Sequence, residues 1–333
     1  MRGEQRVPVV DAEQIAPPTL AATRALTRGA LPGLLATMLV LVVACLIWAP
    51  SVVQPSSLLT LAPVWAVLAL VSIGQMLVIQ QRGIDLSVPG NVALAAALVT
   101  NLSDGSDEML PLAAVCALAA GTAMGCIIGL AVTWLKITPI IVSLAANALA
   151  LGAFFTVTAG RNTAAPDALA DFAVARTLGI PNLLLVLAIP IAAVFVYLRF
   201  TVGGRWFVAT GASPRATKVS GIPTSRYIFG AYVAAGFCFA LAGVALVGYL
   251  RTPGVGIGNT YLFSSVAAVV VGGTSLSGGK GSVIGTVVAA AFLTLLVQFL
   301  YAIGAPSSMQ LIVQALAIAI AAALVSFQLK IKK

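Results

Sequence analysis

The sequence predicts an all-α protein that crosses a membrane about ten times, and three observations support this fold class. Of the 333 residues, 60% are hydrophobic and 8% are charged, whereas soluble domains carry about 25% charged residues. The mean hydropathy is +1.08. The apolar residues form runs that are long enough for helical spans, which need about 20 apolar residues each. These features exclude a water-soluble globule.

Ten apolar runs follow one another along the chain, each bounded by glycine, proline or charged residues. Residues 1–30 are polar and are predicted to form a cytoplasmic tail rather than a cleaved signal. Residues 330–333 are predicted to form a basic cytoplasmic C-terminus, which leaves 31–329 as the membrane domain. The predicted spans are about 31–50, 58–80, 86–102, 110–135, 138–158, 181–199, 227–250, 261–272, 282–301 and 309–329.

Lysine and arginine are sorted by this topology. With the N-terminus inside, only Arg161, Arg176 and Arg251 of the 18 Lys and Arg lie outside. Basic residues collect on the cytoplasmic side of membrane proteins. We therefore predict that both termini are cytoplasmic, and the net charge of +9 needs no nucleic acid partner.

Two of the predicted spans are irregular. Residues 75–91 interrupt an apolar stretch with Arg82, Asp85 and Pro89, and the run at 261–272 is too short to cross alone. Broken helices at membrane depth tend to mark a translocation route, because protein or water must satisfy their polar groups. An ordinary cytoplasmic turn is the alternative. Asp85 follows Arg82 by three residues, which favours a local ion pair.

The two irregular regions also share a pattern. Gly-x-x-Leu-Ser occurs at residues 83–87 and again at 273–277, and each copy is followed by a span that is rich in small residues. Duplicated halves are typical of transport folds. We therefore predict an internal repeat, with a chance match in apolar sequence as the alternative.

The fourth span carries a stripe of glycines. Gly121, Gly125 and Gly129 recur at four-residue spacing, which places them on one helical face. Bare backbone on such a face allows a neighbouring helix to pack closely. We interpret this stripe as structural.

A second glycine cluster, at residues 272–282, resembles a phosphate-binding loop but lacks its spacing. A Walker A loop needs glycine five residues before the one that precedes its lysine, and Ser or Thr directly after the lysine. Around Lys280, those outer positions are Thr274 and Gly281. The chain is therefore not expected to bind ATP through this loop, and Lys280 is predicted to have no nucleotide role.

The loop at 200–226 contains the pattern of a short helix. Ser213 can cap it, Pro214 fits its first position and Gly221 can end it. A basic loop that only fixes the topology is the alternative, but that task does not require a cap at each end. We prefer a docking helix for a cytoplasmic partner.

Four segments carry a resemblance to a known family. They are Gly83-Ile84-Asp85-Leu86-Ser87, Gly211 to Ala216 with Ser220-Gly221-Ile222, Gly272 to Ser282, and more weakly Thr138 to Leu144. Together they resemble the permease subunits of bacterial ABC importers of the ribose/xylose/arabinose and autoinducer-2 class, the branched binding-protein-dependent transport permease family. The resemblance covers about residues 58–325. It departs from the family at Val88-Pro89-Gly90, where the family has no proline.

The resemblance implies a ten-helix permease of the bacterial cytoplasmic membrane that is not itself an enzyme and binds no cofactor. Its implied partners are a second permease, identical or homologous, a separate cytoplasmic ATPase that uses ATP and Mg, and a substrate-binding protein outside. The residues that it implies for coupling to the ATPase are Gly211, Ser213, Pro214, Ala216, Ser220, Gly221 and Ile222.

A neutral, hydroxylated solute needs hydrogen bonds rather than charges, so the amides within the spans are candidates for the translocation route. The solute is expected to be a monosaccharide or a similar small molecule carried by alternating access. The same amides could instead bond helix to helix. The candidate residues are the amides Gln75, Asn91, Asn147, Gln298, Gln310 and Gln314, together with Asp85 and Ser87 at the break.

Two other classes of protein compete with this interpretation. An ion-coupled secondary transporter would use carboxylates or histidines within the membrane, but the chain has no histidine and Asp85 is the only acid near a span. An intramembrane enzyme would need clustered catalytic groups. The four cysteines, which lie in apolar runs without ligand spacing, are interpreted as packing residues: Cys45, Cys116, Cys126 and Cys238.

Overall fold

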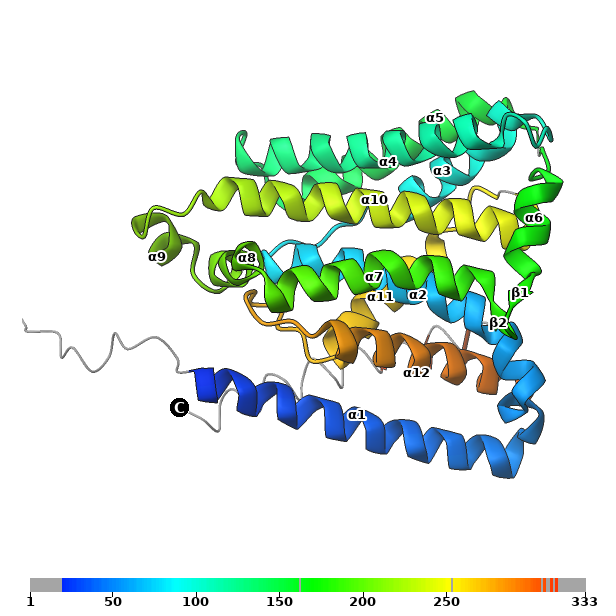
Figure 1. The fold of residues 1–333 in the computed structure, drawn as a ribbon, viewed down its shortest axis with the longest axis horizontal. Coiled ribbons are helices and arrows are strands. Elements are labelled where there is room, and N and C mark those ends of the chain that lie inside the picture. The colour runs from blue at the N-terminus through cyan, green and yellow to red at the C-terminus, as the bar shows by residue number, and fades with distance from the viewer. Residues whose placement is uncertain are drawn as a thin grey trace, which may run out of the picture.

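The computed structural model describes residues 20–161, 163–252, 254–306, 308–309, 312–313 and 315–316. Helices make up most of this part of the chain, and the only β-structure described in it is one two-stranded hairpin (Figure 1). The elements are α1 (Leu20–Trp48), η2 (Pro50–Val53), α2 (Pro55–Gln80), α3 (Val88–Ser103), α4 (Leu110–Thr133), α5 (Pro139–Thr158), α6 (Asp167–Val174), β1 (Arg176–Thr177), β2 (Ile180–Pro181), α7 (Asn182–Phe200), α8 (Val202–Ala212), α9 (Pro214–Val219), α10 (Thr224–Leu250), α11 (Asn259–Val271) and α12 (Val283–Ala302).

Seven helices of the described chain are long and apolar enough to cross a membrane. They are the 31–48 part of α1 and the whole of α2, α4, α5, α7, α10 and α12. This finding confirms the all-α, polytopic class. The predicted run at 309–329 lies almost wholly outside the described residues, so the count of ten spans stays a prediction. α1 begins at Leu20, inside the segment that the sequence analysis assigns to the N-terminal tail.

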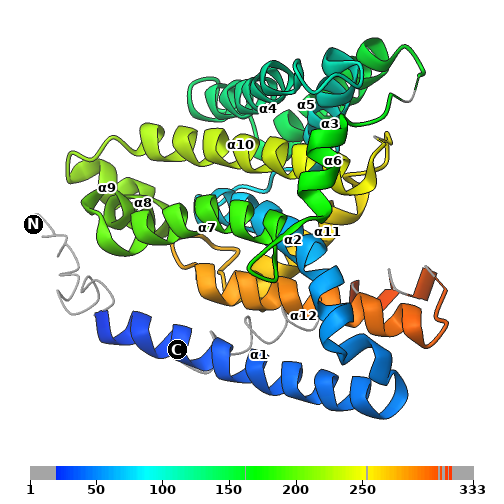
Figure 2. The same cartoon turned by 45° about the vertical axis from the view of Figure 1, so that its right-hand side comes forward.

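The long helices lie side by side between two ends of the molecule (Figures 1 and 2). One end carries α8 and α9, and we call it the α9 end. The other carries α6 and the β1–β2 hairpin, and we call it the α6 end. The C-terminal end of α2 and the loop between α11 and α12 lie at the α9 end, where Gly279 N donates to Gln80 O over 2.9 Å.

α2 is the central helix of the bundle. Its apolar side chains surround it instead of forming one stripe, which is typical of a helix buried on all sides. Every residue from 66 to 80 is buried, and α2 packs against α7, α10, α11 and α12. The outer helices expose large apolar side chains, for example Leu39, Leu149 and Ile189, as expected for surfaces that face lipid.

α3 and α11 are each shorter than a membrane span. At 1.5 Å per residue they are about 24 and 20 Å long, against about 30 Å for the hydrocarbon core. α3 runs to the α6 end and α11 to the α9 end, and they meet where they begin: a Cβ on Gly258 would lie 2.7 Å from Pro89 Cα. Together they make one composite crossing.

The structure corrects two expectations: the span predicted at 86–102, and the ordinary cytoplasmic turn as the alternative to a broken helix. The sequence predicts that 86–102 crosses by itself. Residues 81–87 instead lead back into the bundle, where Asp85 and Ser87 are each 1% exposed. The chain at 81–87 is therefore a break within the protein and not a surface turn.

The glycine stripe of α4 is structural, as the sequence indicates. Gly121, Gly125 and Gly129 all face α10. A Cβ on Gly125 would lie 2.3 Å from Tyr232 O, so only glycine allows the two backbones to approach this closely.

The two Gly-x-x-Leu-Ser copies both follow a helix at the α9 end. Residues 83–87 follow α2, and 273–277 follow α11. Their environments differ, because Ser87 is buried whereas Ser277 is exposed. The internal repeat stays a prediction.

Candidate functional site

The break between α2 and α3 brings together three of the predicted route residues. Asp85 Oδ1 accepts hydrogen bonds from Ser87 N at 2.8 Å and from Ser87 Oγ at 2.6 Å. The Gln75 side-chain amide faces the backbone of Asp85, so that Asp85 N–H donates to its oxygen and its nitrogen donates to Asp85 O, both over 3.2 Å. All three residues are buried. The break is thus held by its own polar side chains.

Asn147 and Asn91 fix the first turn of α3 in the bundle. Asn147 Oδ1, from α5, accepts from Gly90 N at 2.7 Å. Asn91 Nδ2 lies 3.3 Å from Gly121 O and 3.4 Å from Gly236 O, at the crossing of α4 and α10. The first amides of a helix have no partner within it, and here Asp85 and Asn147 supply two of the acceptors. These side chains therefore act as contacts between helices in this conformation.

Two acceptors at the break have no hydrogen-bond partner within the described chain: Asp85 Oδ2 and Asn91 Oδ1, both buried. They belong to the segment before α3 and to its first turn, in the middle of the bundle. A hydroxylated molecule can donate hydrogen bonds to unpaired acceptors of this kind. The arrangement suits hydrogen bonding to a neutral ligand.

The expected ion pair between Arg82 and Asp85 is wrong. The Arg82 side chain points to α8, where Nε donates to Gly211 O over 2.8 Å and Nη2 donates to Ala212 O. The ion pairs in the described part of the molecule join Arg251 to Asp167 and Asp171. Side chains three residues apart face each other only within a helix, and α2 ends at Gln80, before Arg82.

The remaining amide candidates do not join this cluster. Gln298 is partly buried on α12, and no described hydrogen bond connects it to the break. Gln310 and Gln314 lie outside the described residues. Sequence reasoning also missed Gln81, which is buried and donates from Nε2 to Phe207 O over 2.9 Å. Its position just past an apolar run was the available signal.

The helix predicted within the loop at 200–226 is α9. Ser213 is its N-cap and accepts from Ala216 N at 3.5 Å, Pro214 is its first residue, and Gly221 adopts φ +80° just beyond it. α8, which comes directly before α9, is not predicted from the sequence. One correction concerns Gly211, which lies on α8 and is buried against Gln80 O, so it is not part of the exposed surface of α9.

The glycine-rich loop between α11 and α12 is a packing element in this structure. A Cβ on Gly279 would lie 2.5 Å from Ala212 Cα, and one on Gly281 would lie 1.7 Å from Gln80 Nε2. Its glycines are explained by close contacts with α2 and α8, without a phosphate.

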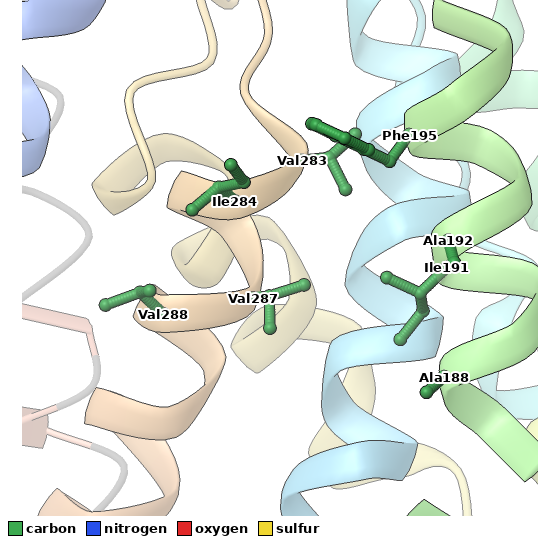
Figure 3. A pocket seen from close by; sticks show the side chains of 8 residues that line it. All are labelled: Ala188, Ile191, Ala192, Phe195, Val283, Ile284, Val287 and Val288. Atoms are coloured by element: carbon green, nitrogen blue, oxygen red, sulfur yellow. The ribbon is translucent and has the colours of Figure 1, made fainter. Parts of the chain in front are cut away.

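A separate cavity of about 290 Å³ lies between α7 and α12 (Figure 3). Figure 3 shows Val283 and Val287 of α12 opposite Phe195 and Ile191 of α7, and all of its labelled side chains are apolar. A hydroxylated solute would find no hydrogen-bonding side chain there, so we do not place the route in it. Its lining residues are Ala188, Ile191, Ala192, Phe195, Val283, Ile284, Val287 and Val288.

Comparison with known proteins agrees with this architecture. The model of the family described as "Branched-chain amino acid transport system / permease component" matches residues 56–322. A probable ABC transporter permease protein of Sinorhizobium fredii (strain NGR234) is 35% identical, over 77% of each chain. The ribose import permease protein of Escherichia coli K12 is 32% identical, over 86% of this chain and 91% of that one.

An autoinducer 2 import system permease protein of Escherichia coli O9:H4 is 31% identical, over 72% of this chain and 74% of that one. No solved structure matches the chain significantly. The family match covers most of the chain and includes the break, α9 and the glycine-rich loop. The chain therefore belongs to this permease family of ABC importers, whose members are multi-pass proteins of the cytoplasmic membrane.

Proposed function

We propose that the chain carries a monosaccharide or a similar small hydroxylated solute into the cell by alternating access, as the membrane subunit of an ATP-driven importer. The relatives named for ribose and autoinducer 2 support this solute class. So does the chemistry of the break, where the amides of Gln75, Asn91 and Asn147, the Ser87 hydroxyl and the Asp85 carboxylate gather. The one cation of this segment, Arg82, directs its guanidinium away from them, to α8. Hydrogen bonds alone suffice for a neutral solute.

The proposed site of coupling to ATP hydrolysis is α9. It lies at the tip of the α9 end (Figure 1) and exposes Ala216, Arg215 and Lys218. Val219 is 90% exposed on the same short helix. An apolar side chain presented on a rigid, capped helix at the end of a molecule suits a partner that covers it. We infer that a separate ATPase, which binds the ATP and Mg, docks here.

The other partners follow from the same assignment. The α9 end would be cytoplasmic, the α6 end would receive solute from an extracytoplasmic binding protein, and a second permease, identical or homologous, would complete the pathway. The described charges support this orientation: the acidic residues Asp104, Asp107, Glu108, Asp167 and Asp171 all lie at the α6 end. Basic residues dominate the α9 end, as the cytoplasmic side of a membrane protein requires.

Ala216→Trp tests the docking role of α9. The indole would stand on the exposed face of the helix without entering the bundle, so we expect normal membrane abundance together with loss of the ATPase from the purified complex. Ribose uptake and ATP hydrolysis stimulated by the binding protein should be lost as well. The measurement is co-purification of the ATPase with the permease, followed by uptake in reconstituted vesicles.

Ala168→Trp is the matched control, because Ala168 is an exposed alanine on α6 at the opposite end. It should retain the ATPase at the parent level. If Ala216→Trp also retains the ATPase and transports at the parent rate, α9 is only a loop that fixes the topology. A parent complex that binds the ATPase but takes up no monosaccharide and no similar small hydroxylated solute, ribose and autoinducer 2 included, would contradict the solute class.

A further inference from the structure

Four helices of the described chain end with the same pair of backbone hydrogen bonds. After α9, α11 and α12, one backbone N–H donates to the carbonyl three residues earlier in the chain, and the next N–H donates to the carbonyl five residues earlier. After α2, Arg82 N donates to Ile79 O over 2.9 Å and Gly83 N to Val78 O over 3.1 Å. The first donor in such an ending adopts a positive φ, and glycine is favoured there because it has no Cβ.

α2 differs from the other three at this position. Gly221, Gly273 and Gly304 follow α9, α11 and α12, with φ between +77° and +87°. Arg82 takes the same place after α2, with φ +65°. An L-residue in this conformation is less stable than glycine. The backbone conformation of the turn therefore does not explain why arginine occupies this position. The contacts of its side chain must explain it.

The Arg82 side chain reaches the C-terminal end of α8. Its guanidinium donates to Gly211 O at 2.8 Å through Nε and to Ala212 O through Nη2. Carbonyls in the last turn of a helix lack internal partners and carry partial negative charge, so a cation binds them well. Gln81 adds a third contact from its Nε2 to Phe207 O.

The segments at this contact are packed too closely to admit a side chain at either glycine. A Cβ on Gly211 would lie 1.9 Å from Gln80 O, and one on Gly278 would lie 2.4 Å from Arg82 Cγ. We call the contact of residues 80–82 with α8 and with 278–281 the Arg82 junction. Because it is packed and hydrogen-bonded, α8 cannot shift without displacing the end of α2 or breaking these bonds.

Residues 83–87 connect the Arg82 junction to the middle of the bundle by a short, fixed path. A Cβ on Gly83 would lie 2.2 Å from Tyr232 Oη, so the chain is pressed against α10. Asp85 is held by Gln75 on one side and by Ser87 on the other. Ser87 is the N-cap of α3, the half helix that abuts α11.

We propose that Arg82 is a positioning residue for transport: it links α8 and α9 to the break, so that movement of α9 displaces the start of α3. The inference rests on the proposed function, because it assumes that an ATPase moves α9. It adds a direct connection from α8 to the centre of the bundle, besides the covalent connections of α9 to α8 and α10. Arg82 would touch neither ATP nor solute.

Arg82→Gly separates this role from a structural one. Glycine suits the positive φ, which offsets the loss of the two hydrogen bonds to α8, so the melting temperature of the purified permease should change little, and the ATPase should still co-purify. Ribose uptake should fall by about tenfold or more, within the range of coupling between distant sites. ATP hydrolysis should then no longer respond to the loaded binding protein. Arg82→Asn, which also tolerates this φ but is too short to reach α8, should behave alike.

Lys136→Gly is the matched control. Lys136 is an exposed cation with φ +55° at the same end, and no described hydrogen bond or ion pair joins its side chain to α8. It should transport at the parent rate.

Parent-level uptake by Arg82→Gly would overturn the proposal, and so would loss of both Arg82 variants from the membrane, since arginine would then serve folding. If Ala216→Trp releases the ATPase while Arg82→Gly transports normally, the Arg82 junction plays no part in transport but the proposed function stands. If Ala216→Trp retains the ATPase and transport, α9 is not the docking site and the inference on Arg82 loses its premise, although the transport function stands. The proposed function itself fails if the parent complex takes up no solute of the proposed class.

Discussion

Asp85 is the one acidic side chain that is buried in the described chain, and its local role is to cap α3. Asp85→Asn keeps an oxygen for the two Ser87 donors, so we expect normal abundance and uptake near the parent rate. Asp85→Ala removes the acceptor and leaves a buried amide unpaired, which costs about 1–3 kcal/mol. The measurement is membrane abundance together with ribose uptake.

The pair of Asp85 variants also addresses the competing class of transporter. If Asp85→Asn folds normally but abolishes uptake, the negative charge itself is needed, as in an ion-coupled mechanism. Uptake by Asp85→Asn, together with loss of Asp85→Ala from the membrane, fits a cap and leaves ATP as the energy source.

Single residues show where sequence reasoning succeeds and where it stops. Ser213, Pro214 and Gly221 predict α9 correctly, because caps and positive φ are local properties of the chain. The expected pairing of Arg82 with Asp85 fails because it assumes a helix that has already ended. The acceptors of Arg82 lie on α8, which is distant in sequence, and no local pattern contains that information.

At the scale of elements, the close packing of α4 against α10 depends on glycine. Gly125→Val would place a branched side chain against Tyr232 O, where a single Cβ already comes within 2.3 Å. Overpacking of this kind costs about 1–3 kcal/mol. We therefore expect a lower melting temperature and lower membrane abundance.

Gly152→Val is the matched control, because a Cβ at Gly152 on α5 would meet no atom within 4 Å. Its melting temperature should equal that of the parent protein. Equal melting temperatures for the two valine variants would mean that α4 and α10 are not in the close contact described here.

Elements differ in how far the sequence predicts them. The long spans follow from runs of apolar residues alone, and the break at 75–91 follows from the polar residues within one. The half length of α3 could not be foreseen, since its apolar run at 86–102 is nearly long enough to cross. Only the buried return of residues 81–87, held by Gln75 and Asn147, places its start inside the bundle.

At the scale of the whole molecule, the two ends differ in charge, and this predicts which end faces the cytoplasm. Cysteines introduced by Ser106→Cys and Asp167→Cys, at the α6 end, should react with an impermeant thiol reagent added to intact cells. A cysteine introduced by Ser213→Cys, at the α9 end, should be protected until the cells are opened. The four native cysteines are first replaced by alanine so that only the introduced thiol reports.

The opposite pattern, labelling at position 213 and protection at 106 and 167, would reverse the orientation. It would also place α9 outside the cell, where no ATPase could reach it. The labelling experiment therefore tests the topology and the site of coupling together.

The composite crossing made by α3 and α11 has a consequence for how such a molecule can open. A continuous helix that parts in the middle of a bilayer loses backbone hydrogen bonds that nothing in lipid replaces. α3 and α11 meet without a shared backbone, so a gap between Pro89 and Gly258 breaks none of the ladder bonds of either helix. The interior of this bundle thus contains a seam, at which the two half helices can separate with their own backbone hydrogen bonds intact.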